Sequence, residues 1–193
     1  MRVVAGAARG RRLVAPKGHD VRPTTDRVKE ALFSSLQPLL PGAHVLDVFA
    51  GAGGLGIEAL SRGAASVTFV ERARPALDAL RRNLDTVGLP GAEVVATDVG
   101  RALRGALPGA PFDVVLADPP YRFDAEELQA VLAGLLDHLV DGATVVVERA
   151  ARDAPPPWPV ELLPQPPRRY GDTALHRAEL RTRDDDASVR RQR

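Results

Sequence analysis

Five Val-rich segments alternate with helical patterns along most of this chain. The strand candidates are residues 44–49, 66–71, 92–97, 112–117 and 143–148, and the helical patterns lie at about 54–62, 73–87, 99–107 and 125–139. The strand candidates lack strict polar alternation, which is typical of strands covered on both faces. Strand–helix alternation of this kind predicts an α/β fold, with a mostly parallel central sheet, right-handed crossovers and helices on both faces.

The N-terminal end departs from this alternation. Residues 1–15 read as two short strands around a Gly-bearing turn, which predicts a basic β-hairpin extension over residues 1–20. A helix follows, with Thr25 or Asp26 as its N-cap, and either Pro38 or Pro41 ends it.

The C-terminal end departs from it as well. Residues 154–167 are too rich in proline for a helix or a central strand, so we expect an extended connection there. Residues 168–180 predict a closing antiparallel hairpin. We therefore expect a main domain over residues 21–181 and a disordered tail over residues 182–193.

Length and composition exclude several classes of protein. With 193 residues, 45% hydrophobic and 26% charged, the chain has the profile of one soluble globular domain. No apolar run is long enough for a membrane span or a secretory signal, so we expect a cytoplasmic protein that binds no membrane. The chain has no cysteine, which excludes disulfides, thiolate metal sites and cysteine nucleophiles. The four histidines lie far apart without H-E-x-x-H spacing, so we expect no metal ion.

The formal net charge of +1 conceals an uneven distribution. Residues 1–30 carry eight basic and three acidic side chains, a local charge of +5, while the remainder of the chain carries −4. A basic arm on a mildly acidic body predicts that the N-terminus contacts a polyanion such as nucleic acid. The alternative is a solvated, arginine-rich surface. The candidate nucleic-acid contacts are Arg2, Arg9, Arg11, Arg12, Arg22 and Arg27.

A glycine-rich turn joins the first sheet strand to the first sheet helix. Residues 51–56 match G-x-G-x-x-G, a pattern in which Gly51 and Gly53 let the backbone approach a ligand at the carboxyl edge of the sheet. Glu71 ends the second strand, where a carboxylate can accept both hydroxyls of a ribose. We therefore expect a nucleoside-containing cofactor. The alternative is a tight turn that only packs the helix on the strand.

Two further acids indicate which cofactor this is. Asp47 stands just ahead of the glycines, where it would repel the pyrophosphate of a dinucleotide but would suit a cation such as the ammonium of S-adenosylmethionine (SAM). Asp98, at the end of the third strand, can accept from the adenine amino group. Together these acids favour SAM over NAD.

The sequence Asp118-Pro119-Pro120-Tyr121 is the most specific feature of the chain. It follows a buried-looking strand, so Asp118 should emerge at the same edge as the glycine loop. The prolines fix the turn and leave carbonyls without intervening N–H donors, while Tyr121 offers a flat stacking face. The Asp118 carboxylate and the Pro119 carbonyl can hold both hydrogens of an exocyclic base amine, orient its nitrogen toward a methyl sulfonium and stabilise the developing positive charge. The alternative is a proline-rich strand exit.

These motifs resemble the SAM-dependent N-methyltransferases with an (N/D)-P-P-(Y/F) motif and, more narrowly, the bacterial small-subunit rRNA guanine-N2 methyltransferase family. The residues that carry the resemblance are 2–6, 10–11, 22–28 with Glu30, 47–53, 58–64, 118–121 and 170–172. They cover the whole chain except its tail. The start of the helix at 22–27 and the N-terminal hairpin discriminate most strongly, whereas the glycine and Asp-Pro-Pro-Tyr motifs occur in many methyltransferases.

The resemblance implies a Rossmann-like class I methyltransferase fold and methyl transfer from SAM to the 2-amino group of a guanine in 16S rRNA. The substrate would be the assembled or assembling 30S subunit, and the enzyme a monomer. In this interpretation Asp47, Gly51 and Gly53 line the methionine part of SAM, Glu71 binds the ribose, Asp98 binds the adenine, and residues 118–121 hold the target base. Ala50, Arg72 and Val99 complete the cofactor set, and Thr25 and Arg27 help to close the site.

Two departures from the family pattern concern the hairpin and local shape: Ala7 and Ala8 replace more usual basic residues, and the connection 154–167 is longer than expected.

Three alternative functions stay open. A DNA or RNA adenine or cytosine amino-methyltransferase would use the same two motifs. An NAD-dependent oxidoreductase fits the glycine loop but leaves residues 118–121 unused. A non-catalytic RNA-binding protein fits the basic arm alone.

Overall fold

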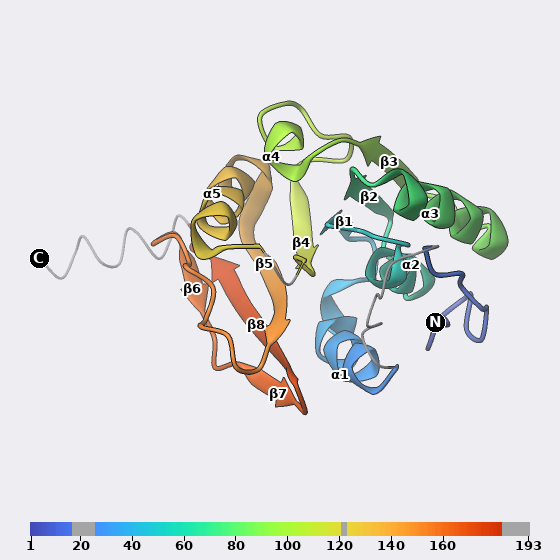
Figure 1. The fold of residues 1–193 in the computed structure, drawn as a ribbon, viewed down its shortest axis with the longest axis horizontal. Helices are drawn as coiled ribbons and strands as arrows, with labels where there is room; N and C mark the ends of the chain where they lie inside the picture. The colour runs from blue at the N-terminus through green and yellow to red at the C-terminus, as the bar shows by residue number, and fades with distance from the viewer. Residues whose placement is uncertain (17–25, 121–122, 183–193) are drawn as a thin grey trace, which may run out of the picture.

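A computed structural model of the chain describes residues 1–16, 26–120 and 123–182. In these residues the strands form one sheet in the order β3-β2-β1-β4-β5-β8-β6, with β7 also paired to β8 (Figure 1). The parallel strands are β1 (His44–Val48), β2 (Ser66–Glu71), β3 (Ala92–Ala96), β4 (Phe112–Ala117) and β5 (Leu139–Ala150). β8 (Thr173–Leu180) runs antiparallel beside β5, and its other edge pairs with β6 (Leu162–Pro164) and β7 (Arg168–Tyr170).

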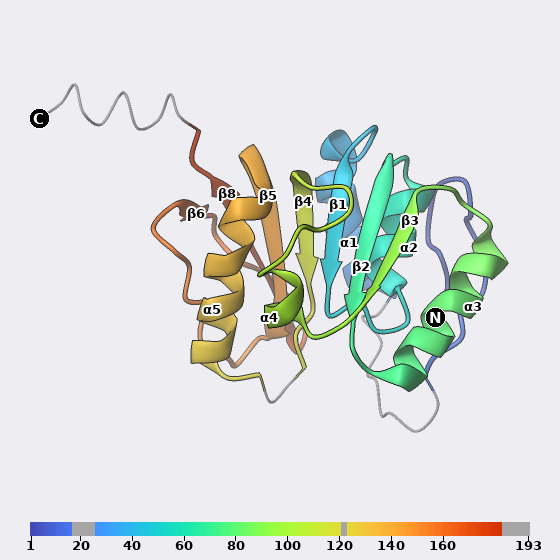
Figure 2. The ribbon, with the colours of Figure 1, turned by 90° about the horizontal axis from the view of Figure 1, so that it is seen from above.

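Helices cover both faces of this sheet (Figure 2). One face carries α1 (Asp26–Leu36), the short 3₁₀ helix η1 (Gln37–Leu39), α2 (Gly54–Ser61) and α3 (Arg74–Val87). The other carries α4 (Val99–Ala102), α5 (Ala125–Leu135) and the 3₁₀ helix η2 (Leu136–His138). Each side buries its own apolar cluster, so the sheet is covered on both faces, as its Val-rich strands predict. The α/β prediction and the closing antiparallel hairpin are confirmed.

Helix α2 packs directly on the sheet because its second glycine leaves no gap. A Cβ atom added to Gly56 would lie 2.3 Å from a ring carbon of Phe69 in β2 and 2.8 Å from a methyl carbon of Val67. No real Cβ makes so close a contact, so a larger residue would push α2 off the sheet. This close packing fixes the start of α2, and with it the glycine loop, at the edge of the sheet.

Several predicted boundaries were wrong. The helix expected over 99–107 ends at Ala102, because the next N–H groups, of Arg104 and Gly105, bond in tight turns to the carbonyls of Arg101 and Ala102. The helix expected over 125–139 ends at Leu135 and tightens into η2. Strand β5 extends well beyond the predicted 143–148 at both ends.

The proline-rich connection also differs from expectation, because it contributes strand β6 to the outer edge of β8. An edge position tolerates Pro164, since the N–H that proline lacks is not needed on the free side. The chain then continues past Gln165, whose N–H bonds to the carbonyl of Arg177 on β8.

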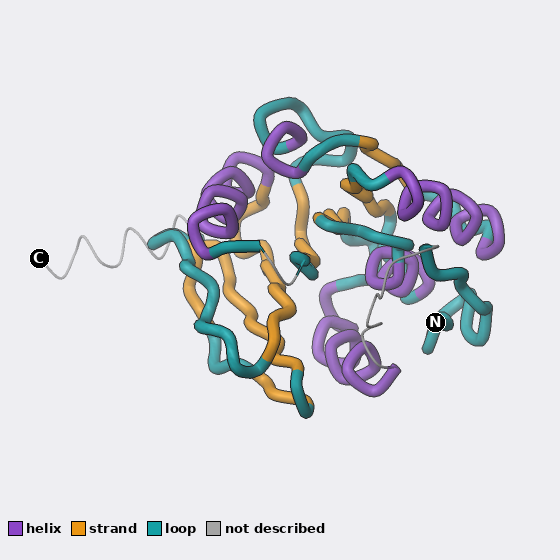
Figure 3. Tube along the Cα trace, in the orientation of Figure 1, coloured by secondary structure: helices purple, strands orange, loops and turns teal. Residues whose placement is uncertain are grey.

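The N-terminal arm, residues 1–16, does not form the two strands predicted for it. Its two halves run antiparallel and meet at a single bridge between Arg2 and Arg12, and Figure 3 draws the arm as loop. The N–H groups of Val3, Gly10 and Leu13 donate across the arm to the carbonyls of Arg11, Val3 and Met1, respectively, at 2.9–3.0 Å. The antiparallel pairing stays short because backbone N–H groups between residues 4 and 8 donate to residues of α2 instead. The predicted boundary at residue 20 and the tail beyond residue 182 lie outside the described residues.

In the part of the chain that the structure describes, no helix combines the length and the apolar character that crossing a membrane requires.

Candidate functional site

The first four sheet strands end at one common edge. The last residues of β1 and β4 are paired, Val48 with Ala117, and Val48 also pairs with Val70 of β2, which pairs in turn with Val95 of β3. The arrowheads of β1, β2 and β4 accordingly point to the same side in Figure 2. Ligands bind at this carboxyl edge in open α/β sheets. The residues that follow each strand therefore form the candidate site.

The two glycines of the loop after β1 have different tasks. Both adopt positive φ, +56° at Gly51 and +83° at Gly53, which favours glycine. A Cβ on Gly53 would lie 2.4 Å from a methyl carbon of Leu80, so this glycine lets the loop pack on α3. A Cβ on Gly51 would meet nothing nearer than the carbonyl oxygen of Phe49, at 4.0 Å. The space at Gly51 is therefore open for close approach by a ligand.

Asp47 is almost completely buried beneath this loop, with 1% of its surface exposed. The N–H of Gly56, in the first turn of α2, donates to its Oδ2 at 2.8 Å. Burial raises the pKa of Asp47 to about 8, against the opposing effect of the Gly56 hydrogen bond, and the charges of Asp118 and Glu71 add to the rise. The charges of Asp118 and Glu71 thus oppose the ionisation of Asp47, and a cation placed there would favour it.

Glu71 fastens the glycine loop to the end of β2. Its Oε2 accepts the N–H of Gly51 at 2.8 Å, and its Oε1 accepts the N–H groups of Arg72 and Ala73 at 2.8 and 2.7 Å. A carboxylate held by three backbone donors is fixed in orientation, and its Oε2 keeps one lone pair free for a hydroxyl of a ribose.

Asp98 and Arg72 form an ion pair that lines a cleft next to the ends of β2 and β3. The Oδ1 of Asp98 caps α4 through the N–H of Gly100 at 3.0 Å, and its Oδ2 pairs with the guanidinium of Arg72 at 3.2 Å. The cleft has a volume of about 520 Å³, and Val99 and Phe123 contribute apolar surface to it. This size and this mixture of apolar walls with a few polar groups are typical of a small-molecule site.

Asp118 follows β4 directly and faces the same edge. It keeps solvent access, but the strands around it displace water, and this desolvation raises its pKa above the ordinary value of an aspartate. The N–H of Phe123 donates to the carbonyl of Pro120 at 2.8 Å. Pro120 and Phe123 also line the cleft.

The structure therefore brings most of the predicted site residues to one edge: Asp47, Ala50, Gly51, Gly53, Glu71, Arg72, Asp98, Val99, Asp118, Pro119 and Pro120. Thr25 and Tyr121 lie outside the described residues, as does Arg22 of the predicted basic contacts. No group of three or more His, Asp or Glu side chains suited to a metal ion occurs in the described ranges. The roles assigned to the individual residues stay predictions.

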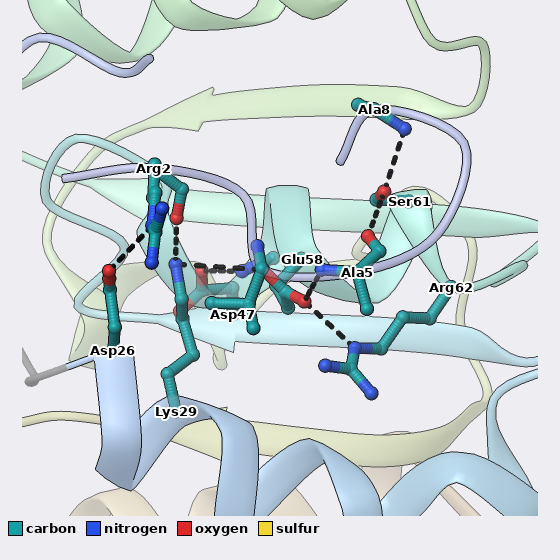
Figure 4. A network of polar contacts seen from close by, with 11 residues as sticks. Arg2, Ala5, Ala8, Asp26, Lys29, Asp47, Glu58, Ser61 and Arg62 are labelled. Atoms are coloured by element: carbon teal, nitrogen blue, oxygen red, sulfur yellow. Dashed lines mark hydrogen bonds and ion pairs between the residues drawn. The ribbon is translucent and has the colours of Figure 1, made fainter. Parts of the chain in front are cut away.

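The arm is anchored to α2 by the buried side chain of Glu58 (Figure 4). The N–H groups of Val4 and Ala5 donate to its two carboxylate oxygens at 2.7 and 3.0 Å. Arg62 donates from Nε at 2.8 Å, and the ammonium of Lys29 lies 3.5 Å away. The buried carboxylate thus meets two cations and two backbone donors, so it holds the arm in one position on α2.

A second anchor joins the arm to the cofactor loop. Asn83 of α3 is buried, and its amide exchanges two hydrogen bonds with the backbone of Val14, at 2.8 and 3.0 Å. The same side chain donates to the carbonyl of Ala52, in the glycine loop, at 2.9 Å. Through Asn83 the arm and the loop share one fixed contact.

The arginines of the arm divide into two groups. Arg9, Arg11 and Arg12 are exposed, as is Arg27 on α1. Arg2 is exposed as well, but its Nε pairs with Asp26 at 2.8 Å. Three guanidinium groups therefore project from an arm whose backbone is held from below.

Sequence reasoning gave no functional weight to Glu58, Lys29, Asn83 and Phe49, although Glu58 and Phe49 lie in segments that carry the family resemblance. An acid in the otherwise apolar segment 54–61 is a signal that could have identified Glu58 as a buried anchor. Nothing local in the sequence marks Asn83, because its partners lie 31 and 69 residues away.

Comparisons with known proteins agree with this site. The family model described as "Conserved hypothetical protein 95" matches residues 1–179. The ribosomal RNA small subunit methyltransferase D of Escherichia coli (strain K12) is 40% identical over 159 residues, which are 82% of this chain and 79% of that protein. Its namesake from Haemophilus influenzae is 39% identical over 150 residues, 77% of this chain and 78% of that one.

Solved structures agree with the sequence comparisons. The structure of the methyltransferase yhhF from Escherichia coli superposes with a TM-score of 0.82 and 33% identity, and the match covers 95% of this chain and 99% of that one. The same arrangement of elements therefore extends over both chains, and the Rossmann-like methyltransferase fold is confirmed. The chain belongs to the family of the ribosomal RNA small subunit methyltransferases D.

Proposed function

We propose that this protein transfers a methyl group from SAM to the exocyclic 2-amino group of a guanine in 16S rRNA. The observation that carries the proposal is the meeting of Asp118 and its two prolines with the glycine loop at one edge of the sheet. Asp118 and its prolines suit a base amine, and the glycine loop suits the cofactor. The names of the relatives support rRNA as the substrate.

The residues at the edge fit SAM. When bound, SAM supplies a methyl group on a positively charged sulfonium. A cationic ligand would offset the opposition of Asp118 and Glu71 to the ionisation of Asp47, whereas a pyrophosphate would add to it. Gly51 leaves open space for a ligand chain, and the cleft beside Asp98 and Val99 suits a nucleoside.

The acceptor side of the site derives its chemistry from Asp118 and Pro119. The lone pair of an exocyclic amine is delocalised into the base, so the nitrogen attacks only when its hydrogens are held out of the base plane. The carboxylate of Asp118 can accept one of these hydrogens and the carbonyl of Pro119 the other. As the nitrogen gains its methyl group it becomes positive, and the adjacent carboxylate stabilises that charge and can take the proton released. Its raised pKa makes Asp118 a better proton acceptor than an ordinary aspartate.

The arm would bring the rRNA to this site. Arg9, Arg11 and Arg12 project from it, and arginine forks suit phosphate oxygens and stack on unpaired bases. We infer that the arm docks on rRNA phosphates while a guanine enters the pocket beside Asp118. The proposed substrate is the assembled or assembling 30S subunit, and we propose a monomeric, cytoplasmic enzyme.

The test uses 30S subunits and naked 16S rRNA from a strain that lacks this protein. Each is incubated with the purified protein and radiolabelled SAM, and the labelled nucleoside is identified by mass spectrometry after digestion. We expect N2-methylguanosine at one position, found again by primer extension. Methyladenosine or methylcytidine in its place would overturn the guanine assignment, and no transfer to any rRNA would overturn the proposed function.

A binding experiment separates the cofactor from the substrate. SAM should raise the melting temperature of the protein, whereas NAD should leave it unchanged. A shift with NAD alone would favour the oxidoreductase alternative. The molecular mass of the free protein, measured by analytical ultracentrifugation, tests the proposed monomeric state.

A further inference from the structure

Phe49 has a backbone conformation that its side chain disfavours. Its φ is +65°, and no other non-glycine residue in the described ranges has a positive φ. For a bulky aromatic residue this left-handed region is a genuine outlier, which persists only where the surrounding structure imposes it. Phe49 sits between β1 and the glycine loop, at the centre of the candidate site.

The unusual φ sends the Phe49 ring to the opposite face of the sheet. Side chains of a strand alternate between faces, and in β1 Val45 and Asp47 face α2 while Leu46 and Val48 face the cluster under α5. Continued alternation would direct residue 49 toward α2. Its ring instead packs against the α5 cluster.

On that face the Phe49 ring meets Phe123 edge to face, with ring centroids 4.8 Å apart and planes at 71°. This is a preferred geometry for aromatic pairs. The N–H of Phe123 also donates to the carbonyl of Pro120. The contact therefore links the end of β1 to Pro120, two residues after Asp118.

The strand register places this contact beside the reacting groups. Val48 pairs with Ala117, so the next residues along the two parallel strands, Phe49 and Asp118, are neighbours at the edge. One step further along β1 is the glycine loop. Phe49 thus stands between the element proposed to hold SAM and the one proposed to hold the base amine.

We propose that Phe49 is a positioning residue for methyl transfer, whose ring holds Phe123, and through its hydrogen bond Pro120, in register with the glycine loop. The inference rests on the proposed function, and it assigns to Phe49 no contact with the reacting atoms. A purely structural core residue would not need a disfavoured φ that turns its ring away from the face that alternation gives it. Fixing the acceptor groups against the methyl donor matters because small misplacements of reacting atoms strongly slow a reaction.

Three variants separate the ring from its backbone conformation. Phe49→Leu keeps apolar bulk but removes the aromatic contact. Phe49→Gly removes the ring and fits the positive φ, so it remains informative if the leucine variant folds poorly. Phe49→Tyr keeps the ring and serves as the conservative control. For each variant we would measure kcat, KM for SAM and for rRNA, SAM affinity by calorimetry, and hydrogen exchange of the Phe123 amide by NMR.

We expect Phe49→Leu and Phe49→Gly to lose kcat by about 10- to 100-fold, while SAM affinity stays within about threefold. The Phe123 amide should exchange faster in both, because its bond to Pro120 loses its support. Phe49→Tyr should match the wild type. Adding Phe123→Leu to Phe49→Leu should cost little more than either change alone, since both remove one contact.

Unchanged kcat and unchanged Phe123 exchange in the leucine and glycine variants would overturn the proposal. So would a fall in kcat that only follows a parallel fall in SAM affinity or melting temperature. If the wild-type protein transfers no methyl group to rRNA, the proposed function fails. Faster Phe123 exchange in that case would still establish that Phe49 holds Phe123 against Pro120, whereas unchanged exchange would overturn the contact itself.

Discussion

Asp47 is a carboxyl group that the fold buries almost completely. Its pKa of about 8 means that the ligand-free protein keeps it protonated at neutral pH, whereas in the unfolded chain it ionises near the ordinary value of 3.8. Between these values the folded state binds the extra proton. The free energy of unfolding must therefore fall as the pH rises through this window, and the loss is complete above about pH 8.

Asp47→Asn isolates this effect, because an amide oxygen can still accept the N–H of Gly56 but does not titrate. We expect the variant to gain stability relative to the wild type as pH rises from 4 to 8, by at most about 1.4 kcal/mol per pH unit, and to gain no more above that. Urea unfolding of both proteins at pH 5, 6.5, 8 and 9 measures the difference. A difference independent of pH would show that Asp47 titrates as an ordinary aspartate.

Asp118→Ala tests the proposed acceptor role at the same edge. We expect kcat to fall by about 100-fold or more, because the carboxylate acts on the charge that develops in the transition state. SAM affinity by calorimetry should stay within a few-fold. The control is Asp137→Ala, which removes an exposed carboxylate at the opposite edge of the sheet, just before β5 begins. Normal turnover with a large loss of SAM affinity would place Asp118 in the cofactor site instead.

At the scale of elements, α3 contributes to the cofactor loop through one side chain. Asn83→Ala would leave the N–H and C=O of Val14 and the C=O of Ala52 without their partner. An unsatisfied buried group such as the Ala52 carbonyl costs about 1–3 kcal/mol. Because the two bonds to Val14 are only partly buried, we expect a total loss of about 2–3 kcal/mol in the free energy of unfolding. SAM affinity should fall too, since the loop loses a support.

Thr86→Ala is the matched control on α3, because its side chain is exposed and only donates to the carbonyl of Arg82 in its own helix. It should change stability by less than about 0.5 kcal/mol. Equal effects of the two substitutions on unfolding by urea would contradict the role of Asn83.

The elements were predictable from sequence where local pattern decides them. Apolar runs such as Val45–Val48 identify the buried strands in the sequence, and the turn at Gly171 identifies the closing hairpin. Helix α4 was predicted too long because apolar spacing does not register the turns that stop it after Ala102. Strand β6 was not predicted, because a proline-rich segment argues against a central strand, whereas an edge strand such as β6 tolerates proline.

The residues of the candidate site also divide into those that the sequence could place and those that it could not. Asp47, Glu71 and Asp118 could be placed at one edge because each follows or ends a recognisable strand. Phe49 and Asn83 could not, since their importance lies in a backbone angle and in partners far away in the sequence.

At the scale of the whole molecule, the charge asymmetry becomes a spatial arrangement. The arm carries its free arginines on a backbone fixed to α2 by Glu58 and to α3 by Asn83. Its first residue lies against the start of α2, where a Cβ on Gly54 would be 2.7 Å from the sulfur of Met1. The two ends of the arm, at Met1 and Val14, therefore stand beside the cofactor edge. Its turn, which carries Arg9 and Arg11, lies at the C-terminal end of α2, where the N–H of Ala7 bonds to the carbonyl of Ser61.

Changing Arg9, Arg11 and Arg12 together to Ala tests this arrangement. Each lost phosphate contact should flatten the dependence of log affinity on log salt by about 0.7–0.9. We therefore expect much weaker rRNA binding and a salt slope reduced by about two to three units, with SAM affinity unchanged. Arg81→Ala with Arg82→Ala, two exposed arginines of α3, is the control and should leave the slope unchanged. If the triple variant kept its rRNA affinity and its slope, the arm would be a solvated surface, because charges that contact no phosphate release no counterions.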